Sequence, residues 1–436
     1  MSKLENIVSL CKRRGFIFPG SDVYGGMAGT WDYGPLGTIL KRNMMDAWWN
    51  YWVDQRDDMY GVDAAIIMNP QVWEASGHVA TFADPLVECK ECHGRFRADK
   101  LVDGATESIT TEEFLKADVK CPTCGKKNWG EIRKFNMMFK THVGPIDDDS
   151  GIAYLRPETA QGIFTNFKNV VDTIYPDMPF GIAQQGKAFR NEISPRDFIL
   201  RDRECSQMEI EYFVKPDDWE RAFEELRAGQ HDFLENVIGL PASAIHELDV
   251  PEADRAHYSK RTIDFMFDYP NGEEELMGLA YRTDFDLSNI QRASGKNMEY
   301  RDKVTGETFV PHVIEPSIGV ERLFLAILSN AYTEEEDRIV LKLPAGLAPY
   351  KYCVSPLLKN KPELVERAKE VYETLKKKYT FVTWDDSGNI GKRYKKQDEI
   401  GTPKCVVVDF EGLEDGTVTV RDRDTTEQVR VKVEEL

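Results

Sequence analysis

The stretch FGIAQQGKAFRNEISPRDFILRDRECSQMEIEYFV, residues 180–214, decides how this chain folds. Its two ends, residues 180–193 and 207–214, are rich in apolar and β-branched side chains and contain no proline. Such runs predict two strands, and the charged segment from Ser194 to Glu204 predicts a long connection between them. The stretch is therefore expected to form a long hairpin.

The same hairpin alternates basic and acidic side chains. Arg190 and Glu192 are two residues apart, as are Glu209 and Glu211, so each pair is expected to share one face of a strand. The connection adds Arg196, Arg201, Arg203 and Glu204. Guanidinium groups bind phosphate oxygens in pairs, whereas carboxylates hold ammonium groups. The pattern suits a substrate with phosphates and an amine, although spacing alone is more simply explained by a solvated charged hairpin.

The rest of the chain indicates a mixed α+β protein of several domains. Its 436 residues predict about three domains at about 150 residues each. Helices are predicted at residues 38–57, 217–237, 320–333 and 363–378, and strands at residues 64–70, 379–384 and 404–410. Residues 343–350 contain two prolines and read as a linker. The three tryptophans of residues 38–57 spread over more than one helix face, so they are either all core or partly available to a second subunit.

The net charge of −19 argues against a basic coat for nucleic acid or for an anionic membrane. Residues 345–436 hold equal numbers of basic and acidic side chains, so the acidic excess lies in residues 1–344. A nucleic acid would then be held by local basic patches. The sequence has no run of about 18 apolar residues, and residues 1–18 read as an amphipathic helix and not as a signal peptide. We expect a cytoplasmic protein with no membrane partner.

Four of the eight cysteines form two CxxC pairs, Cys89 with Cys92 and Cys121 with Cys124, separated by 28 residues. Four thiolates suit tetrahedral zinc, and this arrangement is typical of a reducing compartment. Residues 84–135 around them differ from the flanking sequence in composition, with four cysteines, scattered charges and a polar middle. They are predicted to form a zinc-ribbon-like insertion. Free thiols are the plain alternative. The reading CxxCH at residues 89–93 also matches haem attachment, which the second CxxC pair makes the weaker interpretation.

The segment EPSIGVER, residues 315–322, opens the predicted helix 320–333. Gly319 permits close approach of a backbone or ligand. Arg322 lies in the first helical turn, where the helix dipole disfavours a cation. This mismatch indicates a phosphate or nucleotide ligand, although surface exposure explains it nearly as well.

Taken together, the motifs resemble a class II aminoacyl-tRNA synthetase, and specifically the glycyl-tRNA synthetases of the dimeric bacterial kind. The resemblance covers almost the whole chain and rests on these segments: WDYGPLG (31–37), LRPETAQGIF (155–164), FRNEISPR (189–196), QMEIEYF (207–213), RTDFDL (282–287), EPSIGVER (315–322) and DSGNIGKRYKKQDEIGTP (386–403). It implies a mostly antiparallel catalytic domain at 1–344 with the zinc insertion, and an α/β anticodon-binding domain at 345–436. It also implies a homodimer that acts on glycine, ATP with Mg²⁺ and tRNA(Gly), with no DNA partner.

The resemblance also assigns residues. Its catalytic set is Arg190, Glu192 and Arg322, with Arg190 on the ATP α-phosphate and Arg322 on the adenine or the γ-phosphate side. The implied ATP site is Arg190, Asn191, Glu192, Leu200, Arg201, Asp202, Arg203, Glu204, Cys205, Glu275, Leu276, Gly319, Val320, Glu321 and Arg322. The implied glycine site is Arg97, Glu158, Cys205, Ser206, Gln207, Met208, Glu209, Glu315, Pro316, Ser317, Ile318 and Gly319. The implied tRNA contacts are Lys392, Arg393, Tyr394, Lys395 and Lys396, and the implied zinc ligands are Cys89, Cys92, Cys121 and Cys124.

One departure from the family bears on the nucleotide site. Position 205 is cysteine, where the family usually has a phenylalanine that stacks on adenine. Two other readings stay open beside a glycine–tRNA ligase. One is a synthetase-like binding protein without catalysis, which the joint presence of Arg190, Glu192, Glu209 and Arg322 disfavours. The other is a synthetase for threonine, proline or histidine, which the acidic EPS and MEIE segments disfavour.

Overall fold

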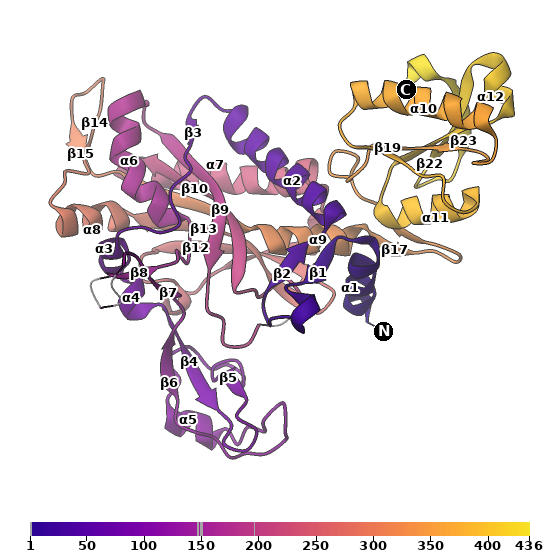
Figure 1. The fold of residues 1–436 in the computed structure, drawn as a ribbon. Helices are drawn as coiled ribbons and strands as arrows, with labels where there is room; N and C mark the ends of the chain where they lie inside the picture. The colour runs from indigo at the N-terminus through magenta and orange to yellow at the C-terminus, as the bar shows by residue number, and fades with distance from the viewer. Residues whose placement is uncertain (1, 146–147, 149–150, 196) are drawn as a thin grey trace.

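The computed structural model describes residues 2–145, 148, 151–195 and 197–436. A seven-stranded sheet in the order β11-β12-β13-β16-β10-β9-β3 forms its centre (Figure 1). Its strands are β3 (Met59–Gly61), β9 (Phe180–Phe189), β10 (Glu204–Val214), β11 (Ile245–Asp249), β12 (Arg261–Tyr269), β13 (Gly272–Thr283) and β16 (His312–Gly319). All neighbours pair antiparallel except β3 with β9. The α+β expectation and the central hairpin β9–β10 are confirmed.

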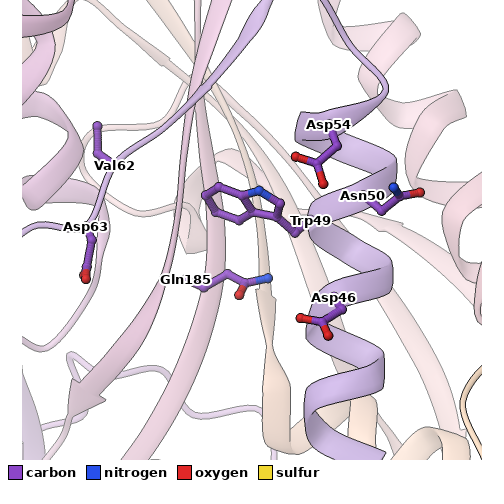
Figure 2. Close-up of a pocket in the computed structure, with 7 residues that line it drawn as sticks. All are labelled: Asp46, Trp49, Asn50, Asp54, Val62, Asp63 and Gln185. Carbon is purple, nitrogen blue, oxygen red and sulfur yellow. The ribbon is translucent and has the colours of Figure 1, made fainter. Parts of the chain in front are cut away.

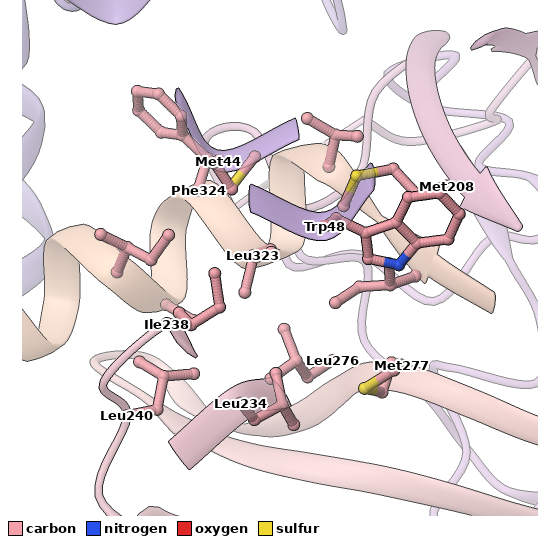
Figure 3. Close-up of a cluster of buried hydrophobic side chains, with 14 of the residues drawn as sticks. Met44, Trp48, Met208, Leu234, Ile238, Leu240, Leu276, Met277, Leu323 and Phe324 are labelled. Atoms are coloured by element: carbon pink, nitrogen blue, oxygen red, sulfur yellow. The ribbon is translucent and has the colours of Figure 1, made fainter. Parts of the chain in front are cut away.

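One face of this sheet packs on helices and forms the main core. The helices are α1 (Lys3–Arg14), α2 (Pro35–Trp49) with its π-helical extension Asn50–Asp54, α7 (Trp219–Asp232) and α9 (Val320–Ala331). Met208 of β10 and Leu276 of β13 meet Trp48 of α2 and Leu323 of α9 in this core (Figure 3). Because side chains alternate along a strand, the residues between them face the opposite side of the sheet.

That opposite face is only partly covered. Helix α6 (Ala160–Ile174) packs there against β9 and β10, with α8 (Phe285–Ser294) beside it. The ring of Phe167 from α6 contacts those of Phe180 and Phe213. The remainder of this face, over β10, β13 and β16, is open and forms the floor of a cleft.

Residues 84–135 build a separate small module that projects from the body beside this cleft (Figure 1). It holds a three-stranded sheet in the order β5-β4-β6 and the helix α5. These elements are β4 (Ala83–Glu88), β5 (Arg95–Arg97), α5 (Thr111–Lys116) and β6 (Arg133–Asn136). Two short helices precede it, α3 (Pro70–Ala75) and α4 (His78–Thr81). The module has its own core, in which Trp129 packs edge-on against Phe96 and Phe114.

The C-terminal region forms a second sheet in the order β20-β19-β21-β22-β23. Its elements are β19 (Tyr352–Pro356), α10 (Pro362–Lys378), β20 (Val382–Trp384), α11 (Ile390–Ile400), β21 (Lys404–Val408), α12 (Phe410–Asp415), β22 (Thr417–Asp422) and β23 (Gln428–Lys432). Helix α11 faces the part of the protein that holds the seven-stranded sheet (Figure 1), where Glu399 pairs with Arg14 at 2.6 Å and Asp398 pairs with Arg338 at 3.0 Å.

Short pairs of strands complete the described chain: β1 (Ile17–Pro19) with β2 (Trp31–Tyr33), β7 (Lys140–His142) with β8 (Ile152–Tyr154), β14 (Tyr300–Arg301) with β15 (Thr308–Phe309), and β17 (Tyr332–Glu334) with β18 (Ile339–Leu341). The predicted helices 320–333 and 363–378 are confirmed within two residues, helix 217–237 is α7 followed by the π-helical segment Phe233–Val237, and helix 38–57 is α2 with its extension.

The strand expected at residues 64–70 is wrong. The segment contributes one isolated bridge, Ile67 to Leu155, and Pro70 opens helix α3. Proline is favoured in a first helical turn because it lacks only a hydrogen bond that the turn does not make. In the described residues, no helix is both long and apolar enough to cross a membrane.

Candidate active site

A cleft of about 480 Å³ lies on the open face of the central sheet. Its floor comes from β10, β13 and β16, one wall from the β9–β10 connection, and its rim from the insertion module. Strand alternation decides which side chains reach it. On β10, Cys205, Gln207 and Glu209 line the cleft, while Met208 between them belongs to the core.

Two carboxylates, Glu209 and Glu315, line the cleft, and the fully buried Glu211 lies next to them. Glu209, Glu211 and Glu315 each offer an oxygen, and these oxygens lie within 4.8 Å of one another. Thr159 and Ser317 donate hydroxyl hydrogen bonds to Glu209, the latter over 3.0 Å. Neither oxygen of Glu211 has a hydrogen-bond partner among the described residues. A small cationic group would therefore find three carboxylates at hand.

Burial sets the electrostatics of these carboxylates. Burial raises the pKa of Glu211 well above its ordinary value, and the charge of the neighbouring Glu315 raises it further. Burial likewise raises the pKa of Glu315, against the opposing effect of Arg282. A cation bound among these groups would lower both pKa values, because it favours their charged forms. Perturbed carboxyl groups gathered in a cleft are typical of a functional site.

A buried arginine braces Glu315. Arg282 of β13 binds both oxygens of Asp286 at 2.8 and 2.9 Å and Glu315 at 2.8 Å. Its guanidinium lies 3.7 Å from the ring centroid of Tyr258, and its side chain is 1% exposed. Gln161 of α6 donates to Asp286 over 2.8 Å. These contacts fix Glu315 in place and leave Arg282 no free face for a ligand.

Two arginines, Arg190 and Arg322, line the same cleft. Arg190 at the end of β9 donates to the carbonyl of Pro157 over 3.0 Å, and its guanidinium lies 5.6 Å from the ring centroid of Phe82. Arg322 pairs with Glu275 at 2.9 Å. The charge of Arg322 and its hydrogen bond hold the pKa of Glu275 below its usual value. This pairing explains how a cation is tolerated in the first turn of α9.

The structure places other expected site residues at the cleft as well. Those that line it are Arg97, Glu158, Glu192, Leu200, Arg201, Asp202, Cys205, Gln207, Glu275, Ser317, Gly319 and Glu321. Glu321 is only 3% exposed and binds the backbone N–H of Ser206 at 2.8 Å and the Lys41 ammonium at 3.0 Å. Lys41 also donates to the Ser206 hydroxyl. Helix α2 is thereby tied to the floor of the cleft.

Several expected ligand residues turn their side chains away from the cleft. Met208, Leu276, Ile318 and Val320 are core residues with at most 1% exposure, and Pro316 alternates with Glu315 and Ser317 on β16. Contacts from these positions would have to come through the backbone.

Three polar residues of the β9–β10 hairpin also do not line the cleft. Arg203 donates to the carbonyls of Ala28 and Glu192, and Glu204 pairs at the surface with Lys187. Asn191 donates its backbone N–H to Met137. These three therefore shape the hairpin. Arg196 lies outside the described residues.

Comparison with known proteins decides the family. Residues 139–331 match the family described as "tRNA synthetase class II core domain (G, H, P, S and T)", and residues 351–436 match "Anticodon binding domain". The glycine–tRNA ligase of Malacoplasma penetrans is 48% identical over 446 residues, which span 99% of this chain and 96% of that protein. The chain belongs to the glycine–tRNA ligase family. The ligases of Alkaliphilus oremlandii and Caldanaerobacter subterraneus are 48% and 49% identical, each again over 99% of this chain.

In this glycine–tRNA ligase fold, the four cysteines of the insertion come together. Their sulfur atoms all lie within 4.8 Å of one another. The Cys89–Cys124 and Cys92–Cys121 pairs are separated by 3.7 and 3.6 Å. Sulfur atoms about 2.3 Å from a tetrahedral zinc ion would be about 3.8 Å apart. The geometry is therefore compatible with a Zn²⁺ site.

The basic cluster expected to meet RNA lies on α11, and its members differ in exposure. Lys392 is exposed, Lys395 pairs with Asp337, and Lys396 pairs with the buried Asp385 at 3.1 Å. Arg393 is 3% exposed and donates to four backbone carbonyls, from Pro356 and from residues 386–388. Arg393 therefore shapes the loop before α11. The Arg421 guanidinium covers the half-buried ring of Tyr394, 4.7 Å from its centroid.

A second hollow, of about 550 Å³, lies between α2 and the loop after β3. Trp49 points into it from α2 toward Val62 and Gln185 (Figure 2). Its lining includes Asp46 and two further aspartates but no lysine or arginine. Although it is the larger hollow, it offers no cation for a phosphate. The chemistry therefore belongs to the cleft over β10.

Several residues of the cleft escaped the sequence analysis. Glu211 was noticed only as the strand partner of Glu209, and Arg282 only as part of a motif. His78 gave no signal, and Gln161 stood out only as part of the segment LRPETAQGIF, residues 155–164. Their local surroundings contain neither a charge alternation nor a ligand spacing.

Proposed function

We propose that this protein joins glycine to tRNA(Gly) in two steps at the cleft over β10. The observation that carries the proposal is the joint lining of one cleft by the carboxylates of Glu158, Glu209 and Glu315 and by the guanidinium groups of Arg190 and Arg322. This cleft lies within a class II core, which fits two-step aminoacylation, and in a chain whose relatives are glycine–tRNA ligases.

In the first step, a carboxylate oxygen of glycine attacks the α-phosphorus of ATP. The bond to the bridging oxygen of the β-phosphate breaks, and pyrophosphate leaves with the electron pair. No protein base is needed, since the glycine carboxylate is already ionised. Arg190 offsets charge that develops at the α-phosphate, and Arg322 lies where it can bind the nucleotide. Mg²⁺ bound with ATP neutralises phosphate charge, and Glu275 offers it the oxygen ligand that this cation prefers.

In the second step, a ribose hydroxyl at the 3′ end of tRNA attacks the carbonyl carbon of glycyl-adenylate. The bond between that carbon and the phosphate oxygen breaks, and AMP leaves. Throughout both steps Glu158, Glu209 and Glu315 would hold the glycine ammonium. An enclosed pocket of this kind selects glycine by leaving no room for a Cβ, because gripping contacts to a side chain are impossible.

The other parts of the chain fit this function. We propose a catalytic domain at residues 1–344, an anticodon-binding domain at 345–436, and a structural Zn²⁺ held by the four cysteines of the 84–135 module. Lys392 on α11 is the most accessible residue of the expected RNA cluster. Free thiols at all eight cysteines support a reducing compartment, which we take to be the cytoplasm. Helix α2, with its partly exposed Trp49, supports a homodimer.

Glycine-dependent exchange of labelled pyrophosphate into ATP tests the activation step. The wild-type protein is expected to support exchange with glycine but not with alanine, serine, threonine, proline or histidine. Arg190→Gln should abolish exchange while circular dichroism shows the fold unchanged. Charging of tRNA(Gly) with labelled glycine then tests the transfer. Absence of exchange with glycine would refute the proposal and favour a non-catalytic binding protein.

A further inference from the structure

His78 is a buried residue at the edge of the cleft that the mechanism above does not use. It begins helix α4 and is 7% exposed. Its Nε2 lies 3.2 Å from a carboxylate oxygen of Glu158, and its Nδ1 lies 2.8 Å from the Ser76 hydroxyl. The ring packs edge-on against Trp73, and the Phe82 ring covers another side of it. Both nitrogens and the ring itself are thus held in one orientation.

Glu158 is the carboxylate that links His78 to the cleft. One of its oxygens meets His78, and the other accepts a hydrogen bond from Gln161 over 3.3 Å. Burial alone would raise the pKa of Glu158, but His78, Arg282 and Arg190 lower it to about 2. Glu211 and Glu315 have raised pKa values in the same cleft. Glu158 is therefore a carboxylate that stays charged before any cation arrives.

We propose that His78 is a positioning residue for amino-acid binding, which holds the Glu158 carboxylate toward the ammonium group of glycine. The inference rests on the proposed function and adds a residue to it. A carboxylate with one oxygen fixed by an imidazole and the other by an amide has little freedom to rotate. Because the Glu158 side chain is already ordered, no entropy is lost in ordering it when glycine binds, and the affinity for glycine is higher.

The contact between His78 and Glu158 also connects the cleft to the base of the insertion module. Helix α4 stands at the neck of the insertion module, where Asn136 of β6 donates to the carbonyl of Val79 over 2.9 Å and the N–H of Met137 donates to Phe82 over 3.0 Å. Phe82 also touches the Arg190 guanidinium. Helix α4 and its C-cap residue Phe82 therefore contact both Glu158 and Arg190, and His78 makes the contact to Glu158.

The test compares two substitutions of His78 by pyrophosphate exchange, with the full-length protein. His78→Leu removes the hydrogen bond to a charged group, so the KM for glycine should rise about tenfold or more. The kcat and the KM for ATP should stay within about twofold of wild type, since the ring nitrogens of His78 contact Glu158 and Ser76 and none of the residues assigned to ATP. His78→Gln retains an N–H donor near the Nε2 position and should recover most of the glycine affinity.

Trp73→Phe is the matched control, because it loosens packing on the same imidazole and leaves both ring nitrogens with their partners. It should lower the melting temperature without raising the KM for glycine. The proposal is overturned if His78→Leu leaves the KM for glycine within about twofold of wild type. It is also overturned if His78→Leu and His78→Gln raise the KM for glycine equally. A rise of the same size in Trp73→Phe would overturn it as well. If His78→Leu does not fold, His78→Phe, which also lacks a ring N–H, is measured in its place, and a KM for glycine within about twofold of wild type overturns the proposal. A wild-type protein without glycine-dependent exchange refutes the proposed function instead.

Discussion

Asp202 offers a prediction about stability that can be worked out in numbers. It lies in the β9–β10 connection, lines the cleft, is 7% exposed, and its Oδ1 has no hydrogen-bond partner among the described residues. Burial, followed by the nearby charge of Glu321, raises the pKa of Asp202 to about 8. The folded protein therefore keeps a proton on this carboxyl at neutral pH, whereas the unfolded chain releases it.

The sign of the pH dependence follows from this difference. Between the unfolded pKa of about 3.9 and the folded pKa, unfolding releases one proton. The free energy of unfolding should then fall by about 1.4 kcal/mol per pH unit as pH rises through this window. Asp202→Asn keeps the shape of the side chain but introduces a group that does not titrate. The free energy of unfolding of this variant therefore lacks the pH-dependent contribution of Asp202. From pH 6 to pH 7.5, the variant should gain about 2 kcal/mol of stability relative to wild type.

Urea unfolding of both proteins at pH 6.0 and 7.5, followed by tryptophan fluorescence, measures the effect. The difference between the unfolding midpoints of the variant and of wild type should widen as pH rises. Asp54→Asn, which changes an exposed aspartate and keeps Asp202, is the control, and its unfolding midpoint should differ from that of wild type by the same amount at both pH values. A difference between Asp202→Asn and wild type that stays constant over this range would refute the argument that Asp202 is protonated in the folded state.

Four further predictions concern the substrates and the metal. Cys205→Phe should lower the KM for ATP several-fold, since an aromatic ring at this position would stack on adenine for about 1 kcal/mol; an unchanged KM for ATP would contradict the stacking argument. Glu209→Gln should raise the KM for glycine about tenfold or more with little change for ATP, as the loss of a charged hydrogen bond predicts; equal effects on both substrates would argue against an ammonium contact. Cys121→Ser should lose the one zinc ion per chain that elemental analysis is expected to find in wild type, and a metal-free wild type would contradict the zinc site. Lys392→Ala should raise the KM for tRNA and weaken its salt dependence while leaving pyrophosphate exchange unchanged; an unaltered KM would remove this residue from the RNA surface.

The sequence predicted well what depends on a strand's periodicity. Glu209 and Glu211 share a face on β10 as expected, and Glu315 with Ser317 faces the same cleft from β16. Side-chain alternation with a period of two is a local property, so it can be read without knowing the partner strand. The same rule explains why Met208, inside an expected ligand segment, is a core residue.

Contacts between distant segments could not be predicted in this way. Arg322 was expected to bind a ligand because a cation suits the first turn of a helix poorly, yet Glu275 on another strand is already its partner. Arg393 was counted with the RNA-binding lysines because it stands among them in the sequence. Its actual role depends on the carbonyls of residues 386–388 and Pro356. A run of charges shows which residues are charged, but only the fold determines which charges remain free.

Part of the acidic excess of the chain lies in the cleft, where it can orient glycine. Glycine offers an ammonium group and a carboxylate and nothing else, so its orientation must come from charge. Under the proposed function, a pocket lined by Glu158, Glu209 and Arg190 would turn the ammonium toward the carboxylates and the glycine carboxylate toward the nucleotide. A neutral pocket of the same shape would accept glycine in either direction. Buried carboxylates lower the stability of the free protein. In the proposed reaction they would align the attacking oxygen of glycine, and such orientation lowers the barrier to reaction.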